Sequence, residues 1–109
     1  MKKRNIDWSN KSETKDYHPH LIKKIEAMLP GCEVHKNDPN KTQGIEDLLI
    51  LHNNKWATLE AKISEKARRT PEPNQEYYVK KHNDMAYASF IYPENEDVVL
   101  DELCNYFKK

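Results

Sequence analysis

The sequence predicts an α/β domain in which a mixed four-stranded sheet has helices on both faces and a further helix closes the chain. Three observations lead to this fold class. An apolar stripe of helical spacing comes first, an asparagine pair joins two β-prone segments, and a second amphipathic stretch separates that hairpin from a last short strand. The order is therefore α-β-β-β-α-β-α, and the helix before the fourth strand is a crossover that adds a parallel pair.

The composition limits the size and the partners of the protein. A chain of 109 residues forms one domain, which buries roughly 65% of its unfolded surface. With 18 basic and 18 acidic residues there is no net charge, so a nucleic-acid footprint must be a local cluster. No apolar run approaches the ~20 residues of a membrane span, and the first 16 residues lack the apolar core of a signal peptide. We therefore expect an intracellular, cytoplasmic protein without a membrane partner, in which Cys32 and Cys104 are reduced thiols.

A polar arm is expected before the domain. Residues 1–17 are mostly polar and charged, with Trp8 as the side chain suited to anchor them, and the domain spans residues 18–109. Three basic residues at the start could contact DNA, but a mobile arm is the favoured interpretation. These residues are Lys2, Lys3 and Arg4.

The first helix and the first strand follow this arm. Pro19 suits the first turn of a helix, apolar residues then recur at helical spacing, and Pro30-Gly31 ends it. His18 projects onto the centre of the same apolar stripe. Residues 32–37 alternate in polarity and predict a strand, which the segment 37–40 ends.

A hairpin forms the centre of the predicted sheet. The segments 47–52 and 55–63 are β-prone, and Asn53-Asn54 tolerates the positive φ of a two-residue turn. With these two residues in the turn, Asp47 faces Glu60, with Cβ atoms ~4.5–5.5 Å apart on one face of the sheet. Two acids in that position repel each other unless a cation lies between them.

Lys62 shares the face of Glu60, because it lies two residues further along the same strand. Two carboxylates and a lysine on one face indicate a divalent-metal site with a positioned ammonium. The simpler interpretation is an acidic pair that has Lys62 as its salt-bridge partner. The strand register and the order of elements favour the metal site.

A charged loop is predicted directly after the third strand, over residues 64–73. It holds the densest basic cluster outside the termini, which comprises Lys66, Arg68 and Arg69. A solvated connection and a loop that grips phosphate beside the site fit this cluster about equally well.

The last three elements follow from caps and apolar spacing. Asn74 is placed to cap a helix that runs to about Ala88, and Gln75 points inward from its first turn, towards the end of the third strand. Residues 89–92 predict the fourth strand, and Asn95 is placed to cap the last helix. The apolar face of that helix comprises Val99, Leu103, Tyr106 and Phe107.

These residues resemble the signature of the PD-(D/E)XK nuclease superfamily. Asp47 in the segment GIED, followed thirteen residues on by Glu60-Ala61-Lys62, matches its motif, with Glu46 where such motifs often carry proline. The predicted order is similar to the αβββαβ core of this restriction-endonuclease-like fold, plus one helix. Within the superfamily, the nearest likeness is to the small virus-type replication–repair nuclease domain (VRR-NUC) and to Holliday-junction resolvases.

The resemblance implies a Mg²⁺- or Mn²⁺-dependent deoxyribonuclease. Asp47, Glu60 and the backbone carbonyl of Ala61 would hold the metal. Lys62 would orient or help deprotonate the attacking water and stabilise the transition state. The product would be a hydrolysed phosphodiester bond.

Two further positions take their expected roles from the same resemblance. Related nucleases often carry a glutamine where Gln75 stands, to hold water or metal. They can carry an acid of the first helix near the place of His18, where it touches the metal or orients the site. A histidine there favours a structural role or a helix cap over metal binding.

The expected substrate is DNA of a particular shape. A single domain without a recognition module has little means of reading base sequence, so junctions, flaps or nicks are the expected targets. The resemblance implies phage- or virus-type replication, recombination or packaging in the host cytoplasm. A homodimer would suit symmetric cutting of a four-way junction.

Two functions of other classes are alternatives to the nuclease. A catalytically silent module could bind nucleic acid or a partner protein on the same fold, but inactivated relatives commonly lose the acid or the lysine. Here Asp47, Glu60 and Lys62 are all present. A zinc protein is disfavoured, because the five histidines and two cysteines show neither C-x₂-C nor H-x₃₋₅-H spacing.

Overall fold

The computed structural model describes residues 6–109, so the basic residues of the segment 2–4 lie outside the described part of the chain. The helices are η1 (Glu13–Tyr17, a π-helical turn), α1 (His18–Met28), α2 (Glu65–Arg68), α3 (Gln75–Met85) and α4 (Glu96–Lys108). The strands are β1 (Glu33–Lys36), β2 (Leu48–His52), β3 (Lys55–Ala61) and β4 (Tyr87–Ile91). Within residues 6–109, no helix is long and apolar enough to cross a membrane.

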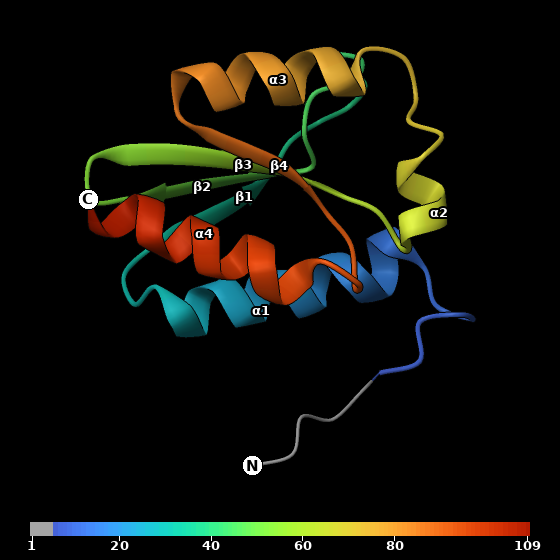
Figure 1. Cartoon of the computed structure of the whole chain (residues 1–109), viewed down its shortest axis with the longest axis horizontal. Coiled ribbons are helices and arrows are strands. Elements are labelled where there is room, and N and C mark those ends of the chain that lie inside the picture. The colour runs from blue at the N-terminus through green and yellow to red at the C-terminus, as the bar shows by residue number, and fades with distance from the viewer. Residues whose placement is uncertain (1–5) are drawn as a thin grey trace.

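The four strands form one sheet in the order β1-β2-β3-β4, in which only the β3–β4 pair is parallel. Figure 1 shows α1 and α4 side by side on one face of the sheet and α3 on the other, with α2 beside the end of β3. The predicted mixed sheet with helices on both faces is therefore confirmed.

The apolar core lies between the sheet and the pair α1 and α4. Leu21 and Ile25 of α1 and Leu59 of β3 are fully buried in one cluster, which also includes the apolar face of α4. The opposite layer is different, because no residue of α3 is fully buried. Most of the hydrophobic stabilisation therefore comes from one side of the sheet.

The hairpin has the predicted register. Asn53 and Asn54 have φ angles of 52° and 62°, and His52 pairs with Lys55. Asparagine occupies this left-handed region more readily than most residues, which makes the pair a good hairpin turn. Leu48 pairs with Leu59, so the next positions of the two strands bring Asp47 beside Glu60.

The boundaries of the crossover helix and the fourth strand differ from the prediction. The helix ends at Met85 rather than near Ala88, and β4 begins at Tyr87 rather than at residue 89. Ala86 leaves the helical conformation, with φ of -149° and ψ of -124°, and Ala88 pairs with Thr58 of β3. Pairing with a central strand outweighs the helix propensity of alanine here.

Local capping also differs from the prediction. Part of the expected loop over residues 64–73 is the short helix α2, because the Ser64 Oγ accepts a hydrogen bond from the Ala67 N–H at 3.1 Å. Asn74 is left-handed, with φ of 71°, and its side chain makes no cap. The Asn95 side chain binds the Tyr92 N–H and the Phe90 carbonyl rather than capping α4.

The end of the predicted arm packs onto the domain. Tyr17 is fully buried, and the Trp8 ring lies edge-on against Tyr17 and His20, at centroid distances of 4.9 and 5.0 Å. Trp8 therefore anchors the segment as expected. The folded region begins before residue 18, because η1 covers residues that the arm was expected to include.

Candidate active site

Two carboxyl groups meet where β2 begins and β3 ends. Glu60 is 2% exposed, and its neighbour Asp47 accepts a hydrogen bond from the Ala61 N–H at 2.9 Å. The hairpin register fixes this pairing, because Asp47 and Glu60 continue the ladder that begins at the turn. The predicted acidic pair is thus brought together, on the face of the sheet that α3 covers.

The pKa values of the two acids are shifted in opposite directions. Burial raises the pKa of Glu60 well above its usual range, and the charge of Asp47 raises it further. Burial also raises the pKa of Asp47, but the contacts with His18, Glu60 and the Ala61 N–H outweigh this effect and lower it. The two shifts therefore favour a protonated Glu60 beside an ionised Asp47 when no cation is bound.

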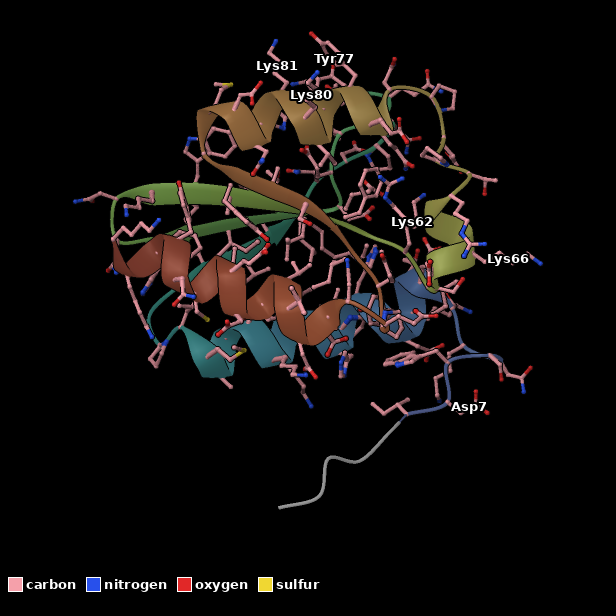
Figure 2. All side chains as sticks on the ribbon, in the orientation of Figure 1. Asp7, Lys62, Lys66, Tyr77, Lys80 and Lys81 are labelled. Carbon is pink, nitrogen blue, oxygen red and sulfur yellow. The ribbon has the colours of Figure 1, made fainter. Side chains whose placement is uncertain are left out.

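Lys62 follows the pair of Asp47 and Glu60 at the end of β3. Its backbone N–H donates to the Ile91 carbonyl at 2.8 Å, which holds the end of β3 against β4. The residue is 7% exposed, and within residues 6–109 its ammonium makes no hydrogen bond or ion pair. The Lys62 charge lowers the pKa of Glu60, but burial and the charge of Asp47 outweigh this effect. Figure 2 shows Lys62 on the inner side of α2.

Gln75 reaches the acid pair from the first turn of α3. Its Nε2 donates to the Glu60 Oε2 at 3.1 Å, and its Oε1 accepts from the Glu72 N–H at 2.9 Å. The side chain is therefore held at both ends. The predicted inward direction of Gln75 towards the end of the third strand is confirmed.

His18 faces the same group of residues from the start of α1. It is 5% exposed, its Nε2 lies 3.5 Å from the Asp47 Oδ2, and neither ring nitrogen has a hydrogen-bond partner within residues 6–109. The contact with Asp47 shows that His18 belongs to the site environment. It caps no helix with its side chain.

The donor atoms suit a hard divalent cation. The buried Oε1 of Glu60 has no hydrogen-bond partner in the described part of the chain, so this oxygen is free to meet a ligand or a water once Glu60 is ionised. No group of three or more His, Cys, Asp or Glu side chains gathers within residues 6–109, so Asp47 and Glu60 would be the main side-chain ligands. Mg²⁺ commonly takes one or two carboxylates and completes its shell with water and phosphate.

The predicted basic cluster does not converge on one point. The guanidinium of Arg68 lies 3.9 Å from the centre of the Phe90 ring and pairs with Glu76, and Arg69 pairs with Glu65. Lys66 points outward from α2 (Figure 2). Arg68 is therefore the member of the cluster that lies nearest to the acid pair along the sheet. Its guanidinium rests on Phe90, and Phe90 is the β4 residue that pairs with Glu60 of β3.

A second buried acid, Glu46, was not predicted as a functional residue. It is fully buried, and its carboxylate accepts hydrogen bonds from the His82 Nδ1 at 2.7 Å and the Thr58 Oγ1 at 2.9 Å. The His82 ring stacks on Tyr78, and Trp56 meets its edge. One available signal was that His82 lies on the inward side of α3, where a buried imidazole needs an acceptor.

Gly44 allows the segment before Asp47 to lie directly against the start of α3. It has φ of +87°, and a Cβ built on it would lie 2.6 Å from the Asn74 Cβ and 2.7 Å from the Pro73 carbonyl oxygen. Gly31 has nearly the same φ, +88°, but a Cβ there would meet nothing within 4 Å. A substitution at Gly31 therefore introduces backbone strain alone, whereas the same substitution at Gly44 introduces backbone strain and a steric clash.

We expect Gly44→Ala to be clearly more destabilising than Gly31→Ala. A left-handed alanine costs about 1–2 kcal/mol at either position. At Gly44 the backbone of the Pro73-Asn74 segment must also move, which should add about 1–3 kcal/mol. Urea unfolding of both variants measures the difference, and equal costs would contradict the close packing.

Comparison with protein-family models, with curated proteins and with solved structures gave no match. The likeness to PD-(D/E)XK nucleases consequently stays an interpretation of these residues. Function must be inferred from the group formed by Asp47, Glu60, Lys62 and Gln75.

Proposed function

We propose that this protein is a divalent-metal-dependent endonuclease that hydrolyses DNA phosphodiester bonds. One observation carries the proposal: Lys62, which makes no ion pair within residues 6–109, follows the pair of Asp47 and Glu60, in which the buried Glu60 has an orphaned oxygen. A buried carboxyl oxygen without a partner reduces stability, so a fold that keeps one next to a second acid and a lysine favours a catalytic explanation.

The order of elements supports the PD-(D/E)XK interpretation. The core α1-β1-β2-β3-α3-β4, with the acidic pair at the β2–β3 hairpin, agrees with the αβββαβ arrangement that the resemblance implies. The helix α4 closes the fold on the side of α1. The same proposal includes a virus- or phage-type role in the host cytoplasm. DNA would be the partner of the protein, and a homodimer would be its working form.

Asp47 and Glu60, together with the Ala61 carbonyl, would hold Mg²⁺ or Mn²⁺. Such an ion supplies Lewis-acid polarisation of the scissile phosphate and lowers the pKa of the attacking water. The water oxygen forms a bond to phosphorus while the bond to one ester oxygen breaks, and that oxygen leaves with a proton. Lys62 stabilises the charge that develops on the phosphate, or orients the water. Gln75 holds the Oε2 of Glu60 by a hydrogen bond, and Glu60 would bind the ion as one of its ligands.

The proposal is tested by cleavage of labelled four-way junction, flap, nicked and linear DNA. Mg²⁺ or Mn²⁺ should support cutting and EDTA should stop it, while Asp47→Asn should be inactive on every substrate. The preferred substrate separates a resolvase from a flap nuclease or an unspecific cutter. Cutting that persists in EDTA, or in Asp47→Asn, would contradict the proposal. Tight binding without cutting in either metal would favour the silent binding module instead.

A further inference from the structure

The helix that carries Gln75 has little apolar anchoring. No residue of α3 is fully buried, whereas α4 has Val99, Leu100, Leu103 and Phe107 buried at 3% exposure or less. Helices in small domains are held mainly by their buried apolar face. Something other than hydrophobic burial must therefore fix the position of α3 over the sheet.

The buried contact between Glu46 and His82 supplies that fixation. The His82 Nδ1 lies 2.8 and 2.7 Å from the two carboxylate oxygens of Glu46, and a carboxylate only accepts, so Nδ1 carries the hydrogen. Glu46 is fully buried, and the His82 side chain is 16% exposed. A charge-assisted hydrogen bond in such surroundings is short and strong, and its loss leaves a buried charge unpaired.

The same contact joins the three segments that supply the proposed site. Glu46 precedes Asp47 in the chain, and its carboxylate also accepts from Thr58, two residues before Glu60 on β3. His82 lies about two turns after Gln75 on α3. The Glu46 backbone is held as well, because its carbonyl accepts from the Asn37 side chain at 2.8 Å.

We propose that Glu46 and His82 are positioning residues, whose contact holds α3 so that Gln75 stays hydrogen-bonded to Glu60. Neither side chain touches the Asp47–Glu60 pair directly by a hydrogen bond. Their effect on catalysis rests on the proposed nuclease function, but their effect on α3 and Gln75 does not. The two consequences can therefore be measured separately.

The variants His82→Leu and Glu46→Gln test this proposal. Leucine removes the hydrogen bond, and glutamine removes the charge while keeping the volume, so one variant remains if the other fails to fold. Thr58→Val is the matched control, because it removes a bond to the same carboxylate without touching α3. Leu100→Ala, in the core on the opposite side of the sheet, controls for lost stability alone.

The first readout is independent of activity. The side-chain amide resonances of Gln75, identified with Gln75→Ala, should move to the position of a free amide in His82→Leu and part of the way in Glu46→Gln. Amide hydrogen exchange in α3 should become at least tenfold faster relative to β3. Thr58→Val and Leu100→Ala should keep the wild-type Gln75 resonances. An unchanged Gln75 signal and unchanged α3 protection in His82→Leu would overturn the proposal.

The second readout is kinetic. His82→Leu should lower kcat by about 10–100-fold, the usual effect of losing a residue that orients metal ligands, with the KM for DNA within about twofold. Leu100→Ala should keep kcat at temperatures well below its melting point. A wild-type protein that cuts no DNA would refute the proposed function but leave the Gln75 measurement valid. Loss of kcat in Leu100→Ala equal to that in His82→Leu would reduce Glu46 and His82 to structural residues.

Discussion

Glu60→Gln is expected to abolish metal-dependent cleavage while the free energy of unfolding at pH 7 stays within about 0.5 kcal/mol of the wild type. Burial and the charge of Asp47 raise the pKa of Glu60, so without metal its carboxyl group is uncharged. Glutamine then replaces a neutral group of the same shape and can keep the contact with Gln75. A neutral amide, however, is a weak substitute for a carboxylate towards a hard cation. The metal contributes several kcal/mol to such a transition state, which corresponds to a rate loss of about 10²–10³-fold or more.

Activity and stability must be measured on the same preparations. Cleavage rates in Mg²⁺ and Mn²⁺, Mn²⁺ binding by paramagnetic resonance and urea unfolding together separate lost chemistry from lost folding. Glu26→Gln, on the exposed side of α1, is the matched control and should behave as wild type. Retention of more than a tenth of the cleavage rate by Glu60→Gln would remove Glu60 from the catalytic group. A large drop in stability would instead show that its charge is part of the fold.

Glu96→Gln is expected to lower the free energy of unfolding by about 3 kcal/mol at pH 7, because it breaks a buried charged network. Glu96 is 7% exposed and accepts hydrogen bonds from the Tyr17 hydroxyl at 2.9 Å and the Lys24 ammonium at 2.7 Å. The His20 ring nitrogen lies 3.0 Å from the same carboxylate. The network joins η1 and α1 to the first turn of α4.

This stabilisation should fade in acid. Burial raises the pKa of Glu96, but the hydrogen bonds from Lys24, His20 and Tyr17 outweigh burial and hold the pKa below its usual value of 4.5. A carboxylate of lowered pKa stabilises the fold fully above that usual value and loses the contribution as the pH falls through the folded-state pKa. Urea unfolding of wild type and Glu96→Gln between pH 7 and pH 3.5 should therefore show a shrinking difference. A difference that stays constant over this range would assign the cost to shape rather than charge.

The hairpin and the acidic pair could be predicted from the sequence because both depend on local rules. Asn53-Asn54 fixes the turn, and strand alternation then carries the register to Asp47 and Glu60 without knowledge of distant residues. The inward direction of Gln75 follows from helical spacing in the same way. These local rules also recovered the order of elements and the mixed sheet.

Contacts between distant segments could not be predicted in this way. The pairing of Glu46 with His82 joins residues 36 positions apart, and no spacing rule connects a loop acid to a helix in the last third of the chain. The end of α3 was missed because pairing of Ala88 with β3 outweighs its helix propensity. Residue 17 was placed in the arm because its burial depends on Trp8 and Glu96, which contact it from elsewhere.

The unequal layers on the two sides of the sheet have a consequence for engineering. Apolar substitutions that improve packing between α4 and the part of α1 beyond His18 can raise thermal tolerance without reaching the acid pair, which faces the other layer. Substitutions on the inner side of α3 should change the position of Gln75 while they lower the stability of the fold only slightly. Selection for heat resistance should therefore collect changes in α1 and α4, and selection for a new substrate should collect them in α2, α3 and the segment between.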